Sequence, residues 1–270
     1  MLDEATTVAY LHRISAGRPD RPDLAALRHL HERHVLSVPF ESLDYHQGKE
    51  IYYKDERIVE KIVHQRRGGA CGELNSAFSF LLEALGFVVH LRHGRVWIGG
   101  RLRDPYNHML LTTEIEGRSW LVDVGFGKGS RYPIALDTPE AQSDPHGVFS
   151  VRTVDERATD VLRDGKPQYR FYDDPTSLSD FDQPIHWYRT SPDSMLLQNM
   201  FCSLPTEDGW VMLKDDVLTV TRGKETTTEQ LAGDAAVLDA YEKWFGITLD
   251  ERPTPSPYLR DSVRMAFEEK

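Results

Sequence analysis

The segment Arg67-Gly68-Gly69-Ala70-Cys71-Gly72-Glu73-Leu74-Asn75 places a cysteine at the predicted start of an amphipathic helix. The helix is predicted because apolar residues follow at helical spacing up to Gly86, namely Leu74, Ala77, Phe78, Leu81, Leu82 and Leu85. A helix N-terminus offers unpaired N–H groups and a partial positive charge, which stabilise a thiolate, the nucleophilic form of cysteine. Position alone leaves two interpretations of Cys71 open, a nucleophile and an inert core residue.

Two predicted strands downstream favour the nucleophile. Asn107-His108 opens one apolar run, and a second run from Trp120 to Asp123 ends in glycines, with the turn residues Glu116-Gly117 between them. Adjacent antiparallel strands can hold a histidine and an aspartate side by side. A thiol needs a base to take its proton, and the imidazole needs a carboxylate to fix its tautomer. We therefore predict Cys71 as nucleophile, His108 as base and Asp123 as orienting carboxylate.

The rest of the chain predicts an α+β protein. Up to about residue 90 the periodicity is helical, with further helices over Asp3 to Ser15, from Pro22-Asp23 and after Asp55. Short runs then predict antiparallel strands that curl into a barrel, at 87–91, 95–98, 108–115, 119–124, 148–154 and 168–172. A hairpin (210–213 and 217–221) and a helix (228–245) follow. The predicted domains are a helical bundle (1–90), an antiparallel β-barrel (91–195) and an α/β region (196–270).

Composition narrows the function. Of 270 residues, 40% are hydrophobic and 28% charged, which is typical of a globular protein, and the net charge of −11 argues against a nucleic-acid-binding surface. We expect a cytoplasmic protein without membrane or secretory segments, in which Cys71 and Cys202 stay reduced and Cys202 is structural. The helix that carries His29, His31 and His34 lacks a metal-binding pattern, so we predict no metal and a solvated or partly buried face.

Four motifs together resemble the arylamine N-acetyltransferase family. The family carries an Arg-Gly-Gly-x-Cys-x-(Glu/Gln)-x-Asn motif, an Asn-His strand start and an Asp-Val-Gly-Phe-Gly strand end. It also carries Pro-Phe-Glu upstream, present here as Pro39-Phe40-Glu41. All four occur in the family's order and spacing, between Pro39 and Gly127. The resemblance implies a papain-like arrangement of the cysteine triad, and a C-terminal region that forms a lid and helps to bind the cosubstrate.

The resemblance also implies residue roles. Cys71 matches the acetyl-accepting nucleophile, His108 its base and Asp123 the orienting carboxylate. Three positions match residues that brace the site by hydrogen bonds and an ion pair: Glu41, Arg67 and Asn75. The implied enzyme is an acyltransferase of xenobiotic metabolism. It moves acetyl from acetyl-CoA to arylamines, arylhydrazines or N-hydroxyarylamines in ping-pong order, with acetyl-CoA as cosubstrate and no tightly bound cofactor.

Substrate contacts follow from the same resemblance. Phe40 and Phe126 match aromatic residues of the acceptor pocket, and Gly125 and Gly127 match the turn where the cosubstrate passes. Because coenzyme A is an anion, Lys128 beside this turn is a candidate contact. Further candidate cations flank the predicted site, Arg101, Arg103 and Arg131. The expected partners are acetyl-CoA and a small aromatic amine or hydrazine.

Two small residues depart from the family's usual pattern. Many members carry bulky side chains where this chain has Ala70 and Gly72, which predicts a roomier mouth for a larger amine. Two other functions stay open on the sequence. One is an amide synthase of the same family, which closes a macrolactam from a polyketide thioester. The other is a papain- or transglutaminase-type cysteine hydrolase, which also has the order Cys, His, Asp or Asn.

Some features carry no assignment from the sequence. The acceptor, the acyl chain length and the oligomeric state are not specified. The segment 136–147, rich in Asp, Pro and Gly, is predicted only as a loop. The aromatic residues Trp187, Tyr188 and Trp210 are predicted to lie in the core or at an interface.

Overall fold

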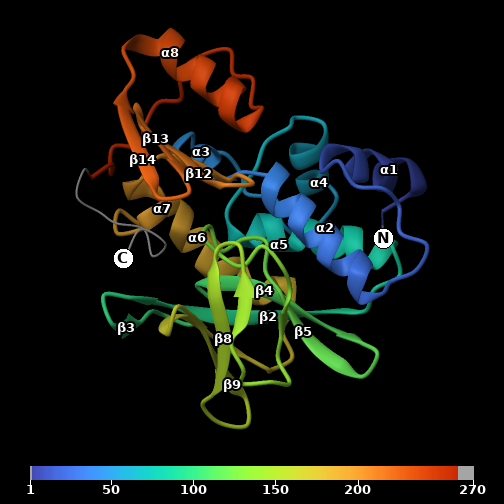
Figure 1. The fold of residues 1–270 in the computed structure, drawn as a ribbon. Coiled ribbons are helices and arrows are strands. Elements are labelled where there is room, and N and C mark those ends of the chain that lie inside the picture. Colours follow the sequence, from blue (N-terminus) through green and yellow to red (C-terminus); the bar gives the residue numbers. More distant parts are fainter. Residues whose placement is uncertain (1, 261–270) are drawn as a thin grey trace.

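A computed structural model describes residues 2–260. Figure 1 shows N-terminal helices on one side, a curled antiparallel sheet below them, and a second sheet capped by a C-terminal helix. The helices are α1 (Glu4–Arg13), α2 (Leu24–Ser37), α3 (Leu43–His46), α4 (Arg57–Val63), α5 (Cys71–Ala84), η1 (Leu178–Phe181), α6 (Asp182–Thr190), α7 (Met195–Gln198), α8 (Gly233–Ala240) and η2 (Tyr241–Phe245). Over residues 2–260, no helix combines the length and the apolar character that crossing a membrane would need.

The N-terminal helices form where the capping residues predict them. The side chain of Asp3 accepts a hydrogen bond from the Thr6 N–H at the start of α1, and Asp23 does the same for Ala26 in α2. Helices α1, α2, α4 and α5 share one apolar core with strands of the larger sheet. Four further helices, α3, η1, α6 and α7, were not predicted; α3, η1 and α7 have four residues each, too few to show an apolar period.

The histidines of α2 correct one prediction. His31 and His34 are fully buried, not on a solvated or partly buried face. The His34 ring lies 3.0 Å from the Tyr10 hydroxyl, and His31 lies against the end of a barrel strand. Burial lowers the pKa of both rings, which keeps them neutral. Both serve as polar core residues with hydrogen-bond partners.

The larger sheet is a nearly closed antiparallel barrel, with strand order β6-β5-β4-β2-β10-β9-β8-β7. The two edge strands meet through one side chain, because Gln142 accepts from the Ala135 N–H and donates to the Ala135 carbonyl. The segment 136–147 therefore contains a strand that helps to close the barrel. The strands are β2 (Val89–Ile98), β3 (Arg101–Leu102), β4 (His108–Ile115), β5 (Arg118–Val122), β6 (Ile134–Ala135), β7 (Gln142–Asp144), β8 (Gly147–Thr153), β9 (Ala158–Arg163) and β10 (Lys166–Tyr172).

Strand β2 differs from the prediction of two strands. It runs unbroken from Val89 to Ile98, because Gly94 pairs in the sheet opposite His108 instead of breaking it. A side chain at Gly94 would lie 3.1 Å from a Leu110 methyl group and 3.2 Å from the Arg170 carbonyl. Gly94 thus permits close packing in the middle of a strand.

The C-terminal sheet has the order β1-β11-β12-β13-β14, with α8 packed on it. Its strands are β1 (Phe40–Glu41), β11 (Phe201–Pro205), β12 (Gly209–Lys214), β13 (Val217–Arg222) and β14 (Glu225–Gln230). The helix predicted over 228–245 is wrong at its start. The β-branched run Thr226-Thr227-Thr228 forms β14, and α8 begins only at Gly233. Since β1 pairs with β11, the N-terminal and C-terminal regions share a sheet, and the three-domain division stays a prediction.

Candidate active site

Cys71 is the first residue of α5 and lies partly exposed in a cleft. The helix start is closed by Glu73, whose Oε2 accepts the Ala70 N–H at 2.9 Å. Gly68, in the loop before α5, allows the backbone to approach the segment at Pro39 closely. A side chain at Gly68 would lie 1.9 Å from the Pro39 carbonyl oxygen. The loop can therefore press against the segment at Pro39, which fixes where α5 begins and where the sulfur points.

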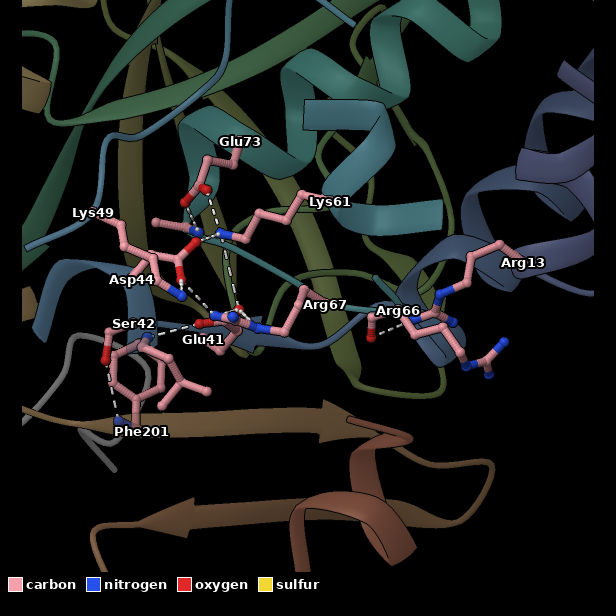
Figure 2. Close-up of polar contacts among 12 residues, drawn as sticks. Arg13, Glu41, Ser42, Asp44, Lys49, Lys61, Arg66, Arg67, Glu73 and Phe201 are labelled. Atoms are coloured by element: carbon pink, nitrogen blue, oxygen red, sulfur yellow. Dashed lines mark hydrogen bonds and ion pairs between the residues drawn. The ribbon is translucent and has the colours of Figure 1, made fainter. Parts of the chain in front are cut away.

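Beside this loop lies a buried cluster of charged side chains, drawn in Figure 2. We call it the loop-support cluster; it consists of Glu41, Asp44, Lys61, Arg67 and Glu73. Lys61 Nζ lies 2.6 Å from Glu73 Oε1 and 2.7 Å from Asp44 Oδ2. Arg67 Nη2 donates to Glu41 Oε1 at 2.7 Å and to Asp44 Oδ1 at 3.0 Å. Burial opposes the Lys61 charge, but the three carboxylates outweigh it and raise the pKa of Lys61 above its usual range.

Sequence reasoning found only part of this cluster. Glu41 and Arg67 were predicted as bracing residues, and the structure places them together. Lys61, Asp44 and Glu73 were missed. One signal was available. Lys61 lies within the run Ile58–Val63, whose apolar residues are predicted to form the buried face of a helix. A lysine in such a position needs a buried partner.

His108, the predicted general base, and Asp123, the predicted carboxylate, lie side by side at the cleft. His108 Nε2 lies 2.7 Å from Asp123 Oδ2, and both side chains are buried. Burial alone would lower the pKa of His108, but the Asp123 charge and hydrogen bond, with a hydrogen bond to Cys71, raise it to about 10. Because Asp123 occupies Nε2, Nδ1 is the ring nitrogen left for the sulfur. The ring is therefore held as an imidazolium, which stabilises negative charge on Cys71.

This pKa implies a pH dependence of stability. The folded protein binds the His108 proton more tightly than the unfolded chain, whose histidines titrate near ~6.5. His108 therefore stabilises the fold fully below that pH, and the contribution is lost as the pH rises through about 10. Urea unfolding should show that the free energy of unfolding of the wild type falls between pH 6.5 and pH 9.5. This fall should be roughly 2–4 kcal/mol larger than the fall in His108→Gln. Equal falls in the two proteins would contradict the raised pKa.

Asp123 is held by several donors besides His108. Asn75 Nδ2 donates to Asp123 Oδ1 at 2.9 Å, and the Gly125 N–H donates to the same oxygen at 3.0 Å. Burial would raise the pKa of Asp123, but the His108 charge and these hydrogen bonds lower it. The His31 Nε2 accepts the Asp123 N–H at 3.2 Å. The carboxylate thus stays ionised and fixed in one orientation.

Tyr169 on β10 was missed by sequence reasoning. Its ring packs 4.8 Å from the His108 ring and 4.7 Å from the Phe126 ring. Burial, and then the Asp123 charge and hydrogen bond, raise the pKa of Tyr169 well above its usual range. Only the fold could reveal this contact, because β10 joins the site by pairing with β2.

Replacing Tyr169 with phenylalanine should remove one hydrogen bond to Asp123 and keep the ring packing. A single hydrogen bond is worth about 0.5–1.5 kcal/mol, so the acetylation rate of Cys71 should fall roughly two- to tenfold. Stopped-flow measurement of the first half-reaction tests this. A variant with an unchanged rate would mean that the hydroxyl does not position the carboxylate.

Comparison with known proteins agrees with this geometry. A family model described as N-acetyltransferase matches residues 23–254. The arylamine N-acetyltransferase of Mycolicibacterium smegmatis is 33% identical over 255 residues, covering 90% of this chain and 92% of the relative. The chain belongs to the arylamine N-acetyltransferase family.

Solved structures of the family share the fold. The Salmonella typhimurium arylamine N-acetyltransferase superposes with a TM-score of 0.84 at 27% identity, over 91% of this chain and 92% of that one. The Mycobacterium marinum enzyme in complex with CoA gives a TM-score of 0.81 at 27% identity, over 89% and 92%. These likenesses place this arylamine N-acetyltransferase homologue in an acyltransferase family.

The glycine turn after Asp123 lies against the nucleophile. A side chain at Gly125 would lie 2.8 Å from Cys71 Cα and 2.7 Å from Asn75 Nδ2, so only glycine fits there without a shift. Gly127 follows with a positive φ of 72°. Lys128 lies 5.7 Å from the centre of the Trp210 ring. The turn therefore packs against Cys71 at Gly125 and lies near Trp210 at Lys128.

Arg131 has a different role from the one predicted. It is buried, and its guanidinium donates to Glu207 Oε2 at 3.0 Å and to the Thr206 carbonyl at 2.8 Å. It joins the glycine turn to the C-terminal sheet. An arginine engaged in this way is not available to bind a cosubstrate.

The cleft at Cys71 has mostly apolar walls, including the predicted Phe40 and Phe126. The small residues beside the cysteine do not widen it. Ala70 is buried, and a side chain at Gly72 would lie 3.3 Å from Ile185 Cδ1 and 3.7 Å from Met109 Cε. Ile185 on α6 therefore fills the space that Gly72 leaves, and the expected roomier mouth does not arise here.

Gly72→Leu should consequently act through Ile185. The added side chain collides with Ile185 and narrows the cleft, so kcat/KM for a bulky arylamine should fall about tenfold, as expected for about 1–3 kcal/mol of overpacking. Adding Ile185→Ala should recover most of the loss. Steady-state kinetics of the single and double variants test the compensation, and additive effects would contradict it.

Proposed function

We propose that this protein transfers an acetyl group from acetyl-CoA to arylamines, arylhydrazines or N-hydroxyarylamines through an acetyl-Cys71 intermediate. The observation that carries the proposal is the His108–Asp123 pair beside a helix-start cysteine at an apolar cleft. That pair supplies charge for the thiolate, and the apolar walls suit an aromatic ring. The CoA bound in the Mycobacterium marinum relative supports a CoA thioester as donor.

The proposed first half-reaction acetylates the enzyme. Cys71 Sγ attacks the thioester carbonyl carbon, and the bond from that carbon to the CoA sulfur breaks. His108 gives its proton to the departing CoA thiolate. The Cys71 N–H at the start of α5 is the candidate donor to the oxyanion that forms on the way.

The proposed second half-reaction releases the product. The amine nitrogen attacks the acetyl carbonyl, and the bond from that carbon to Cys71 Sγ breaks. Neutral His108 takes the proton that the nitrogen loses, which restores the imidazolium–thiolate pair. An arylamine is neutral at physiological pH, so no earlier deprotonation is needed, and His108 acts as a base only in this step.

Intact mass spectrometry tests the proposal. Mixed with acetyl-CoA and no acceptor, the protein should gain one acetyl group, and Cys71→Ala should gain none. Adding an arylhydrazine should discharge the acetyl group as acetylhydrazide. Failure to acetylate while Cys71 still reacts with iodoacetamide would reject acetyl-CoA as donor and favour a carrier-bound polyketide thioester. Rapid loss of the acetyl group to water would favour a hydrolase.

A further inference from the structure

A second compartment, lined partly by α6, adjoins the cleft at Cys71. The inner part has a free volume of about 80 Å³, and the outer compartment about 540 Å³. The two share six lining residues, Ile98, Tyr106, Asn107, Pro184, Tyr188 and Met195. The inner part is lined mostly by apolar side chains, which suit an aromatic ring. The outer compartment is therefore the neighbouring space for the remaining atoms of a larger acceptor whose amine lies at Cys71.

Aromatic side chains form the walls of this outer compartment. Trp187 and Tyr188 lie ring edge to ring face with centroids 5.1 Å apart, and Trp187 is 42% exposed. Tyr106, which also lines the compartment, stacks on His93 with centroids 4.1 Å apart, and His93 stacks in turn on Tyr172. Tyr106 has a positive φ of 59°, which the stack helps to hold. Tyr188 packs against an apolar core cluster as predicted, whereas the exposed Trp187 does not lie in the core.

The charges in the outer compartment favour cations over anions. It is lined by Asp104, Asp180 and Asp193 against one cation, Arg103. Asp193 lies 3.8 Å from Arg260, which offsets part of its charge. Asp180 accepts hydrogen bonds from the Ser177 N–H and hydroxyl, which stabilise its ionised form. Aromatic faces beside carboxylates bind alkylammonium groups.

We propose that the outer compartment is an acceptor subsite, and that the preferred acceptors are para-extended arylamines whose distal group is uncharged or cationic. The inference rests on the proposed function, because it assumes that an amine discharges acetyl-Cys71. In the bound complex the amine-bearing ring lies in the inner part, and the distal group lies between Trp187 and Tyr106.

The test compares acceptors that share one reacting ring. They are 4-aminobenzamide and three forms substituted on the amide nitrogen, with a butyl, a 2-(diethylamino)ethyl or a carboxymethyl tail. Because every acceptor has the same para-amide, the tails change binding and leave the amine's nucleophilicity nearly constant. Each is mixed with preformed acetyl-enzyme, and the rate of deacetylation is measured. The butyl and ammonium tails should raise the second-order rate constant at least fivefold over 4-aminobenzamide, and the carboxylate should not.

Three variants locate the effect. Trp187→Ala should remove most of the rate gain of the extended acceptors over 4-aminobenzamide. The double variant Asp104→Asn/Asp180→Asn should reduce the ratio of the ammonium rate to the carboxylate rate at least threefold. His186→Ala is the matched control, because His186 lies on the same helix but lines a groove with Tyr52 and Lys54. It should change none of these rates.

The outcomes separate the two proposals. A wild-type protein that never acquires an acetyl group contradicts the proposed function itself. An acetyl-enzyme that reacts equally with all four acceptors contradicts the subsite alone. If Trp187→Ala slows acetylation by acetyl-CoA and not deacetylation, the outer compartment serves the donor, and the acceptor subsite is rejected.

Discussion

Replacing Asp123 with asparagine should lower the rate of Cys71 acetylation by roughly 10⁴-fold, the loss that the same change produces in a serine-protease triad. Two donors, from Asn75 and the Gly125 backbone, meet at Asp123 Oδ1. The amide oxygen of an asparagine must take that side, so its NH₂ group faces His108. His108 Nε2 then has to accept, so the ring is neutral with its proton on Nδ1, and the imidazolium that stabilises the Cys71 thiolate is lost.

The same substitution should change the titration of His108. Asp123 raises the pKa of His108 to about 10, so without the carboxylate the pKa must fall. The ¹³Cε1 chemical shift of His108 should show a transition at least two pH units lower in Asp123→Asn than in the wild type. A lower acetylation rate without this shift would indicate local unfolding instead of a change of tautomer.

Asp137→Asn is the matched control for this substitution. Asp137 lies on the surface in an ion pair with Arg118 at 2.7 Å, with side-chain exposures of 39% and 50%. Exposed ion pairs contribute about 0–1 kcal/mol, so its acetylation rate should stay within twofold of the wild type. If Asp123→Asn retained more than a tenth of the wild-type rate, the role of Asp123 as orienting carboxylate would be wrong.

The sequence predicted what local patterns determine. The capping residues Asp3 and Asp23 mark helix starts, and short apolar runs mark β4 and β5. Once those two strands pair, His108 and Asp123 must lie near each other. Motif residues and short-range chemistry were therefore enough to predict the triad.

The missed residues reach the site through long-range contacts. Tyr169 arrives by the pairing of β10 with β2, and His31 arrives because α2 packs on the end of β5. Ile185 lies on α6, and its contact with Gly72 on α5 joins residues that are far apart in the sequence. Such contacts depend on how elements pack, which periodicity does not encode.

The size of the acceptor shows the same limit. Small residues beside Cys71 predict a wide mouth, but the space beside Gly72 is filled from another helix. Open volume lies instead on the far side of Tyr188, between α6 and the loop at Tyr106. A local departure from a family pattern therefore does not by itself indicate a larger substrate, because a distant side chain can compensate for it.

Lys61→Met should lower the free energy of unfolding by about 3–5 kcal/mol, the cost of leaving buried carboxylates without their partner. Lys61 is 6% exposed and lies within 2.7 Å of two carboxylates, Glu73 and Asp44. Methionine keeps most of the volume but removes the charge. Arg67 is then the one remaining buried cation of the loop-support cluster, facing three acidic groups. Urea unfolding at pH 7 measures the loss.

A double-mutant cycle shows whether this loss comes from charge. Adding Glu73→Gln to Lys61→Met removes one stranded carboxylate, so the double variant should be more stable than the sum of the single effects predicts by at least 1 kcal/mol. Lys49→Met is the matched control. Lys49 lies 3.8 Å from Asp44 but its side chain is 57% exposed, so its removal should cost about 0–1 kcal/mol. Equal losses in the free energy of unfolding from Lys61→Met and Lys49→Met would mean that burial does not determine how much the ion pairs of the loop-support cluster stabilise the fold. A large loss from Lys61→Met, with little loss from Lys49→Met, would show that the loop before Cys71 depends on the positive charge of Lys61. An uncharged side chain of similar volume would then be no substitute.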